Sequence, residues 1–182
     1  MVKKISKILN RVFLLFYRHL FGLIAYARRT GVKVGSNCRI YTTNFGSEPF
    51  LITIGNHVTI TAGVTFITHD GSGWLFRDEK GRRYFYAPIE IGNNVFIGVN
   101  SIILPGVKIE SNVIVAAGSV VTKSVPSNSI VAGVPAKIIG RTDTFKDKVL
   151  NEWVSDINFD RTGNYKSKID QLLSKQFKNF LQ

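Results

Sequence analysis

An apolar residue recurs every six positions through much of this chain, and that spacing excludes most folds. These positions, called marks below, are Val34 and Ile40, then Ile54, Ile60 and Phe66, and finally Ile91, Ile97, Ile103, Ile109, Val115 and Val121. An α-helix has 3.6 residues per turn and cannot keep every sixth residue on one face. A β-strand that turns a corner every six residues can do so.

The residues three positions after these marks belong to types that tolerate a positive φ angle. They are Asn37, His57, Gly63, Asn94, Asn100, Gly106, Asn112 and Gly118. A second row, four positions after the marks, is small or apolar and is expected to face inward. It consists of Val58, Val64, Val95, Ser101, Val107, Val113 and Ser119. We therefore predict a mainly β fold, a triangular prism of about five stacked coils between residues 32 and 140.

The repeat is interrupted for about twenty residues, between residues 68 and 88, and then resumes. His69 stands where the break begins, at the same position relative to Phe66 that His57 occupies relative to Ile54. A closed prism offers little concavity of its own, so a pocket must be built from loops and from neighbouring faces. We interpret residues 68–88 as a loop ejected from the coil.

The N-terminal segment, residues 1–31, is predicted to be a basic amphipathic helix. Residues 1–47 carry nine Lys and Arg and no Asp or Glu, within a chain of net charge +12. This asymmetry suggests an anionic surface or ligand, and two placements stay open. The helix is expected either to lie on an anionic membrane or to pack on its own domain or a neighbouring subunit. Its apolar run from Val12 to Phe16 is shorter than the roughly 20 residues of a spanning helix.

The remaining sequence features limit the possible classes of protein. The C-terminal extension, residues 141–182, has Tyr165, Ile169, Leu172, Leu173, Phe177 and Phe180 at helical spacing. It is expected to cap the coils or to brace a neighbour. A single cysteine and no evident signal-peptide cleavage site favour a cytoplasmic protein, and the basic helix leaves peripheral contact with the inner face of the membrane as one of its two open placements. With three histidines and one cysteine in the whole chain we expect no metal site.

The segment "IEIGNNVFIGVNSIILPGVKIESNVIVAAGSVVTKSVPSNSIVAGVPAKIIG", residues 89–140, resembles the hexapeptide-repeat acetyltransferases. Its most specific parts are "AAGSVVTK" and "VAGVPAK". It is most similar to the maltose and galactoside O-acetyltransferases and to those of capsule and exopolysaccharide assembly. The resemblance implies a left-handed parallel β-helix with N- and C-terminal helices, a homotrimer with active sites between subunits, and acetyl-CoA as co-substrate. It also implies a catalytic histidine on an ejected loop.

His69 matches that catalytic position. Acetyl transfer to a hydroxyl needs a base for the hydroxyl proton, and histidine suits this role because its unperturbed pKa of about 6.5 lies near neutrality. The alternative is that His69 is only a turn residue, which is our interpretation of His57. The oxyanion donor is expected to be a backbone N–H at a corner of the coil.

The resemblance also implies where the cofactor and the acceptor bind. Phe96 is expected beside the pantetheine arm, and small Ala117 and Gly118 let that arm approach the backbone. The adenine and phosphate end is assigned to Thr122, Lys123, Lys137 and Arg141. Val99 and Gly140 depart from the family pattern, and Arg141 is expected to compensate for Gly140. Acceptor contacts are assigned to Asp70, Trp74 and Arg77, with the alternatives that Asp70 shapes a turn and that Trp74 packs the loop.

The leading interpretation is an acetyl-CoA-dependent O-acetyltransferase of a sugar or glycan precursor, with no nucleic-acid partner. Four other functions are alternatives to it. An N-acetyltransferase of an amino-sugar nucleotide would be expected to carry an extra N-terminal nucleotide-binding domain. An antibiotic acetyltransferase would share the loop histidine. A γ-type carbonic anhydrase needs three zinc-binding histidines, whereas the repeat region holds only His57 and His69. A non-catalytic prism would not need the cofactor signature.

Overall fold

The computed structural model describes residues 2–155, 157 and 162–173 of the 182-residue chain. These residues divide into two compact units, Met1–Thr142 and Asp143–Gln182. The first unit holds the repeat, the loop and the N-terminal helix. The second holds C-terminal helices.

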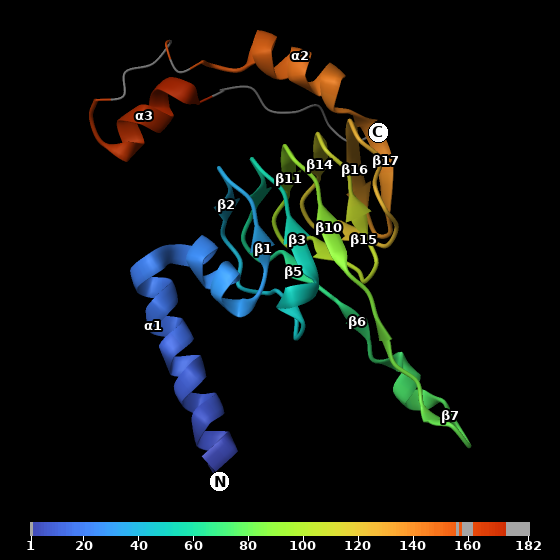
Figure 1. Ribbon diagram of the computed structural model, residues 1–182. Helices are drawn as coiled ribbons and strands as arrows, with labels where there is room; N and C mark the ends of the chain where they lie inside the picture. The colour runs from blue at the N-terminus through green and yellow to red at the C-terminus, as the bar shows by residue number, and fades with distance from the viewer. Residues whose placement is uncertain (1, 156, 158–161, 174–182) are drawn as a thin grey trace. The chain divides into compact units, whose positions relative to one another are not determined.

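Three parallel sheets form the three faces of a prism in the first unit (Figure 1). One face contains β1 (Lys33–Val34), β3 (Ile52–Ile54), β10 (Ile89–Ile91) and β13 (Lys108–Ile109). The next contains β2 (Arg39–Ile40), β4 (Thr59–Ile60), β11 (Val95–Ile97), β14 (Val113–Val115), β16 (Ser129–Gly133) and the antiparallel β17 (Ala136–Arg141). The last contains β5 (Thr65–Phe66), β12 (Ile102–Ile103) and β15 (Val120–Val121). The chain visits the faces in this order and then repeats.

The six-residue marks form the core because successive coils pair in register. Ile91, for example, lies opposite Ile54 on one side and Ile109 on the other. Every mark from Ile40 onward is buried, and so is the predicted second row, including Ser101 and Ser119. The fold class is confirmed as mainly β, a left-handed parallel β-helix with helices at the termini.

The corners have the backbone conformation that the sequence predicts. All eight corner residues have φ between 53° and 79°. Where the first face turns into the second, their side chains form a ladder along the prism. His57 Nδ1 lies 2.8 Å from Asn94 Oδ1, and amide hydrogen bonds of 3.1 Å continue from Asn94 to Asn112 and from Asn112 to Asn128. Asparagine thus satisfies both the positive φ and the stacking of neighbouring corners.

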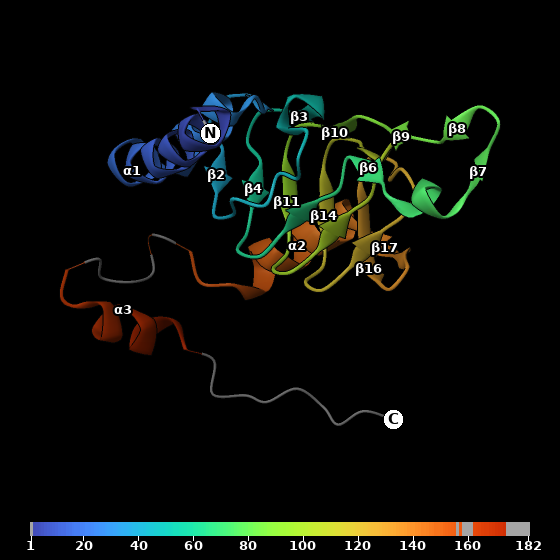
Figure 2. The same ribbon diagram turned by 90° about the horizontal axis from the view of Figure 1, so that it is seen from below.

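Residues 68–88 leave the coil between β5 and β10 as a long hairpin, which Figures 1 and 2 show projecting beyond the prism. At its root β6 (His69–Asp70) pairs with β9 (Phe85–Tyr86) in antiparallel fashion. A short 3-10 helix, η2 (Ser72–Leu75), follows β6. At its tip β7 (Arg77–Asp78) pairs with β8 (Gly81–Arg82).

The N-terminal helix, α1 (Val2–Thr30), is interrupted at Gly22, whose φ of 79° and ψ of 175° are not helical. After this break the helix packs on the first coil: Ala27 is fully buried, and Arg28 donates hydrogen bonds to the carbonyls of Val34 and Gly35. Before it, Phe16 and Leu20 are about two-thirds exposed or more. Among the described residues no helix is long and apolar enough to cross a membrane.

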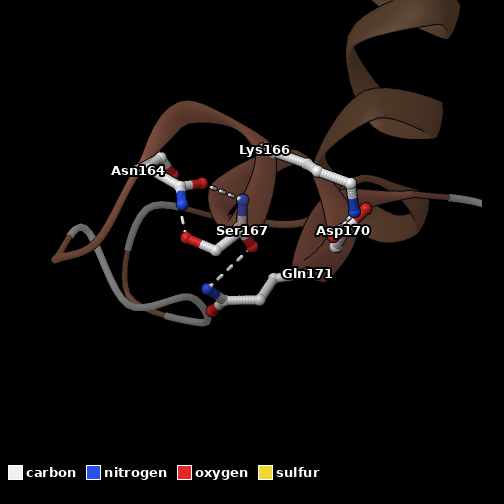
Figure 3. A network of polar contacts seen from close by, with 5 residues as sticks. All are labelled: Asn164, Lys166, Ser167, Asp170 and Gln171. Carbon is white, nitrogen blue, oxygen red and sulfur yellow. Dashed lines mark hydrogen bonds and ion pairs between the residues drawn. The ribbon is translucent and has the colours of Figure 1, made fainter.

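The second unit contains most of α2 (Thr142–Glu152) and all of α3 (Tyr165–Leu172). Figure 3 shows the polar network that begins and braces α3. The Asn164 side chain caps the helix by accepting from the backbone N–H of Ser167 at 2.9 Å, and Lys166 pairs with Asp170 at 2.7 Å. Of the apolar residues predicted at helical spacing, Phe177 and Phe180 lie outside the described residues.

Candidate active site at the root of the loop

The candidate site lies at one edge of the prism, where the third face turns into the first. In the first coil this corner carries an insertion: η1, a 3-10 helix over Pro49–Leu51, separates the two faces. In the second coil the same corner releases the long hairpin. The two corners are adjacent because Asn44 bridges to Thr65 and the rings of Phe45 and Phe66 stack at 5.7 Å. Residues that leave the repeat in one coil therefore meet those that leave it in the next.

Glu48 and His69 meet at this edge. Glu48 Oε2 lies 2.9 Å from His69 Nδ1 and accepts a second hydrogen bond of 2.7 Å from the Thr68 hydroxyl. The Thr68 side chain is buried, and 17% of the Glu48 side chain is exposed against 39% of His69. An ionised carboxylate can only accept, so Nδ1 of His69 carries the proton and Nε2 is left as the free basic nitrogen.

The Glu48 carboxyl is held in its ionised form. The hydrogen bond from Thr68 lowers the pKa of Glu48 below its ordinary value of 4.5; partial burial opposes this, and the hydrogen bond with His69 adds to the lowering. At neutral pH the carboxylate is therefore a permanent acceptor for Nδ1–H. The Tyr86 ring, 5.6 Å from the imidazole between centroids, flanks His69 from the opposite hairpin strand.

A cavity of about 520 Å³ opens beside His69. Two sets of residues line it: the root of the hairpin supplies Ile67, His69, Asp70, Gly71 and Phe85, and the corners of later coils supply Leu104, Pro105 and Thr122. The mixture of apolar walls and a few polar groups is typical of a small-molecule site. No group of three or more His, Cys, Asp or Glu that could hold a metal occurs in the described part of the chain.

Among the residues assigned to the acceptor, only Asp70 lines this cavity. Its carboxylate accepts from the backbone N–H of Ser72 at 2.8 Å, the contact of an Asx turn, so this side chain shapes the start of η2. Trp74 and Arg77 lie farther out on the hairpin and do not line the His69 cavity. They contact each other instead, with the Arg77 guanidinium 4.5 Å from the Trp74 ring centroid.

The residues assigned to the cofactor are spread over the prism. Thr122 lines the His69 cavity, and Lys123 follows it as an exposed residue. Phe96 is 41% exposed on β11, on another face, and Ala117 and Gly118 form the corner between β14 and β15. Lys137 is exposed on β17, and Arg141 ends that strand. None of the three cavities found among the described residues contains this set.

Sequence reasoning did not identify Glu48. Two signals were present: Glu48 is the first acidic residue of the chain, and the marks on either side of it, Ile40 and Ile54, are fourteen positions apart instead of twelve. The two extra residues are the insertion that carries η1. An irregularity in the repeat thus marked this residue as it marked His69.

Comparison with known proteins finds relatives of this chain. The family described as "Hexapeptide repeat of succinyl-transferase" matches residues 88–123. Protein CapG of Staphylococcus aureus is 50% identical over 151 residues, covering 81% of this chain and 86% of that protein. The galactoside O-acetyltransferase of Escherichia coli K12 is 39% identical over 119 residues, which cover 64% of this chain and 57% of that protein.

Among solved structures, a galactoside acetyltransferase in complex with coenzyme A superposes with a TM-score of 0.53 at 27% identity, over 81% of this chain and 85% of that one. At this identity and coverage of relatives the chain belongs to the hexapeptide-repeat acetyltransferase family, as its sequence predicts, and it is an acyltransferase.

Proposed function

We propose that this protein transfers an acetyl group from acetyl-CoA to a hydroxyl of a sugar or glycan precursor. The observation that carries the proposal is the Glu48–His69 pair, 2.9 Å apart, of which His69 lines the 520 Å³ cavity. The names of two relatives, a galactoside O-acetyltransferase and a galactoside acetyltransferase bound to coenzyme A, favour a sugar hydroxyl and a CoA donor.

In the proposed reaction Nε2 of His69 accepts the proton of the acceptor hydroxyl as its oxygen attacks the thioester carbonyl carbon. The tetrahedral intermediate then collapses: the carbon–sulfur bond breaks, and the CoA thiolate takes the proton from Nε2. Glu48 fixes the tautomer that this sequence of steps needs and stabilises the imidazolium between them. Thr68 holds the carboxylate in place through its second hydrogen bond.

The acetyl-CoA site is proposed to lie between two copies of the chain in a homotrimer. The assigned residues occupy different faces of one prism, so a groove shared by two prisms would bring Phe96 of one copy near the Thr122 and Lys123 corner of another. Closed cyclic assemblies are the usual arrangement of identical subunits. Light scattering should give the mass of a trimer at micromolar concentration, and a monomer mass would contradict the shared site.

The cofactor assignment is tested by binding alone. Calorimetry with CoA should show weaker binding when Lys123 or Lys137 is replaced by Ala, because lysine is a common phosphate ligand. Lys33, an exposed lysine of β1, provides the matched control, K33A. If both variants bind CoA as the wild type does, the phosphate end of the cofactor lies elsewhere.

We also propose that the first part of α1 lies on an anionic membrane, so that the enzyme works at the inner membrane face. Val12, Phe13, Phe16 and Leu20 are exposed and span about 100° of the helix circumference, while Arg18 falls on the other side. Because Ala27 is in the core, residues 23–30 must be retained in a test. Deleting residues 1–21 should abolish flotation with anionic vesicles at low salt; full-length protein that ignores such vesicles would contradict the proposal.

The overall function is tested by incubating the protein with acetyl-CoA and a panel of sugars, sugar nucleotides and lipid-linked intermediates. Acceptor-dependent release of the CoA thiol, with an ester-linked acetyl group on the product, is the expected result. Acetylation of an amine in preference to every hydroxyl in the panel would overturn O-acetylation.

A further inference from the structure

Two arginines face each other at the tip of the loop. β7 and β8 pair so that Arg77 lies directly opposite Arg82. Like charges in that position destabilise an antiparallel pair. Within the described residues neither guanidinium has a carboxylate partner: Asp78 pairs with Arg83, and Glu79, the other acidic residue of this turn, forms no ion pair with either arginine. The tip is therefore built with an uncompensated positive charge.

Aromatic rings hold both guanidinium groups in place. The Trp74 ring centroid lies 4.5 Å from the Arg77 guanidinium carbon and 5.3 Å from that of Arg82, and the Tyr84 centroid lies 4.6 Å from Arg82. Stacking occupies the faces of a guanidinium and leaves its N–H edge available. The Nε of Arg82 is shielded from solvent yet has no hydrogen-bond partner among the described residues. Such an oriented, unsatisfied donor calls for an acceptor.

We propose that this loop tip, defined as Trp74, Arg77, Arg82 and Tyr84, binds a phosphate or diphosphate group of the acceptor. Arginine forks match phosphate oxygens, and an anion between the two guanidinium groups would remove their repulsion. The proposal rests on the proposed function and narrows it: the acceptor is a phosphorylated sugar, such as a sugar nucleotide or a lipid-linked sugar diphosphate.

The hairpin connects the tip to His69. A cavity of about 160 Å³ shares Asp70 and Phe85 with the His69 cavity. A further cavity of about 170 Å³, which Arg77 lines, shares Arg83 with the 160 Å³ cavity. Arg82 precedes Tyr86, the strand partner of His69, by four residues, a span of at most about 14 Å. An acceptor can therefore place a ring hydroxyl at His69 while its phosphate reaches the tip.

The same layout assigns the phosphate to the acceptor and not to CoA. The coil corners that line the His69 cavity, Leu104, Pro105 and Thr122, lead along the prism toward Lys123, the proposed donor side. The hairpin instead leads away from the coils, out of the prism (Figure 2). His69 lies between the two.

The binding test uses inorganic pyrophosphate and the fluorescence of Trp74. Trp153 is the other tryptophan of the chain, so the titration is done in a W153F background. Pyrophosphate should change the Trp74 emission, and R82A should weaken its binding about tenfold or more, as expected for hydrogen bonds to a charged group. R82K, which keeps the charge but not the fork, should also weaken it. K80A removes an equal charge from the same hairpin and should leave the affinity unchanged.

Saturating CoA distinguishes the two sources of phosphate. If the tip serves the acceptor, pyrophosphate binds equally well with CoA present, and R82A raises KM for a sugar nucleotide but not for the same sugar without phosphate. Displacement of pyrophosphate by CoA, equal weakening by K80A and R82A, or no pyrophosphate binding would each overturn the proposal. These outcomes do not depend on His69, so O-acetylation could still be measured and judged separately.

Discussion

Two histidines occupy equivalent positions of the repeat and have different surroundings. His57 adopts a φ of 56°, lets the chain continue into β4, and joins the ladder of corner asparagines through Asn94. His69 is extended in β6, opens the hairpin, and joins Glu48. His57 forms a regular corner of the coil, whereas His69 lies where the chain leaves the coil.

The difference shows that the adjacent coil determines which partner a corner histidine contacts. The partner of His57 is a neutral amide at a regular corner of the next coil. The partner of His69 is a carboxylate on an insertion in the preceding coil, at the same edge of the prism. A regular prism repeats its corners and so repeats their contacts. A site of distinct chemistry forms where two stacked corners both depart from the repeat.

The largest expected effect is on turnover in H69A. Loss of the base should slow acetyl transfer about 10²- to 10⁴-fold, whereas CoA affinity by calorimetry should barely change. H57A serves as the matched control and should stay within about twofold of the wild-type rate, since remote surface substitutions have small effects. An H69A enzyme with more than about a tenth of wild-type turnover would place the base elsewhere.

Replacing Glu48 by Gln should have the next largest effect. Glutamine can donate to Nδ1 as well as accept from it, so part of the population holds the wrong tautomer, and turnover should fall about ten- to a hundredfold. As a control, E110Q removes a carboxylate that pairs with Lys108 at 3.0 Å and should leave turnover unchanged. Steady-state rates of the two variants compare them directly; equal rates would remove Glu48 from the mechanism.

At the regular corner the expected effect is on stability. H57A should lower the free energy of unfolding by about 1 kcal/mol, the usual worth of one hydrogen bond, here the contact with Asn94. H57N should restore that stability, because asparagine tolerates positive φ and can continue the ladder. Urea denaturation followed by circular dichroism measures both, and a destabilised H57N would show that the ladder does not explain this corner.

The smallest expected effect is on the free energy of unfolding at low pH. The pKa of Glu48 is lowered in the folded protein, so its carboxylate stabilises the fold above its ordinary value of 4.5, and this contribution is lost as the pH falls through the lowered value. The difference in unfolding free energy between wild type and E48Q should therefore shrink below about pH 4.5. A difference that is constant from pH 7 to about pH 3 would contradict a lowered pKa.

The regular parts of the molecule were predictable from sequence, and the irregular parts were predictable only in position. The spacing of the marks predicted the buried core residues and the eight positive-φ corners, because every coil repeats the same backbone geometry. The break identified His69 and the loop. Glu48 was missed because its partner lies 21 residues away, and only the stacking of two coils brings them together. The arginines of the loop could be noticed in the sequence as candidates for an anionic ligand, but the facing of Arg77 and Arg82 could not, because it depends on hairpin register, which composition does not reveal.

A double-mutant cycle of acetyl-transfer rates in wild type, H69A, E48Q and H69A/E48Q tests the central claim most directly. If Glu48 acts only by orienting His69, removing it from an enzyme that already lacks the imidazole has no further effect, and the double variant matches H69A within about twofold. If the double variant is slower than H69A by the full factor that E48Q shows alone, the two residues act independently and the paired site is wrong.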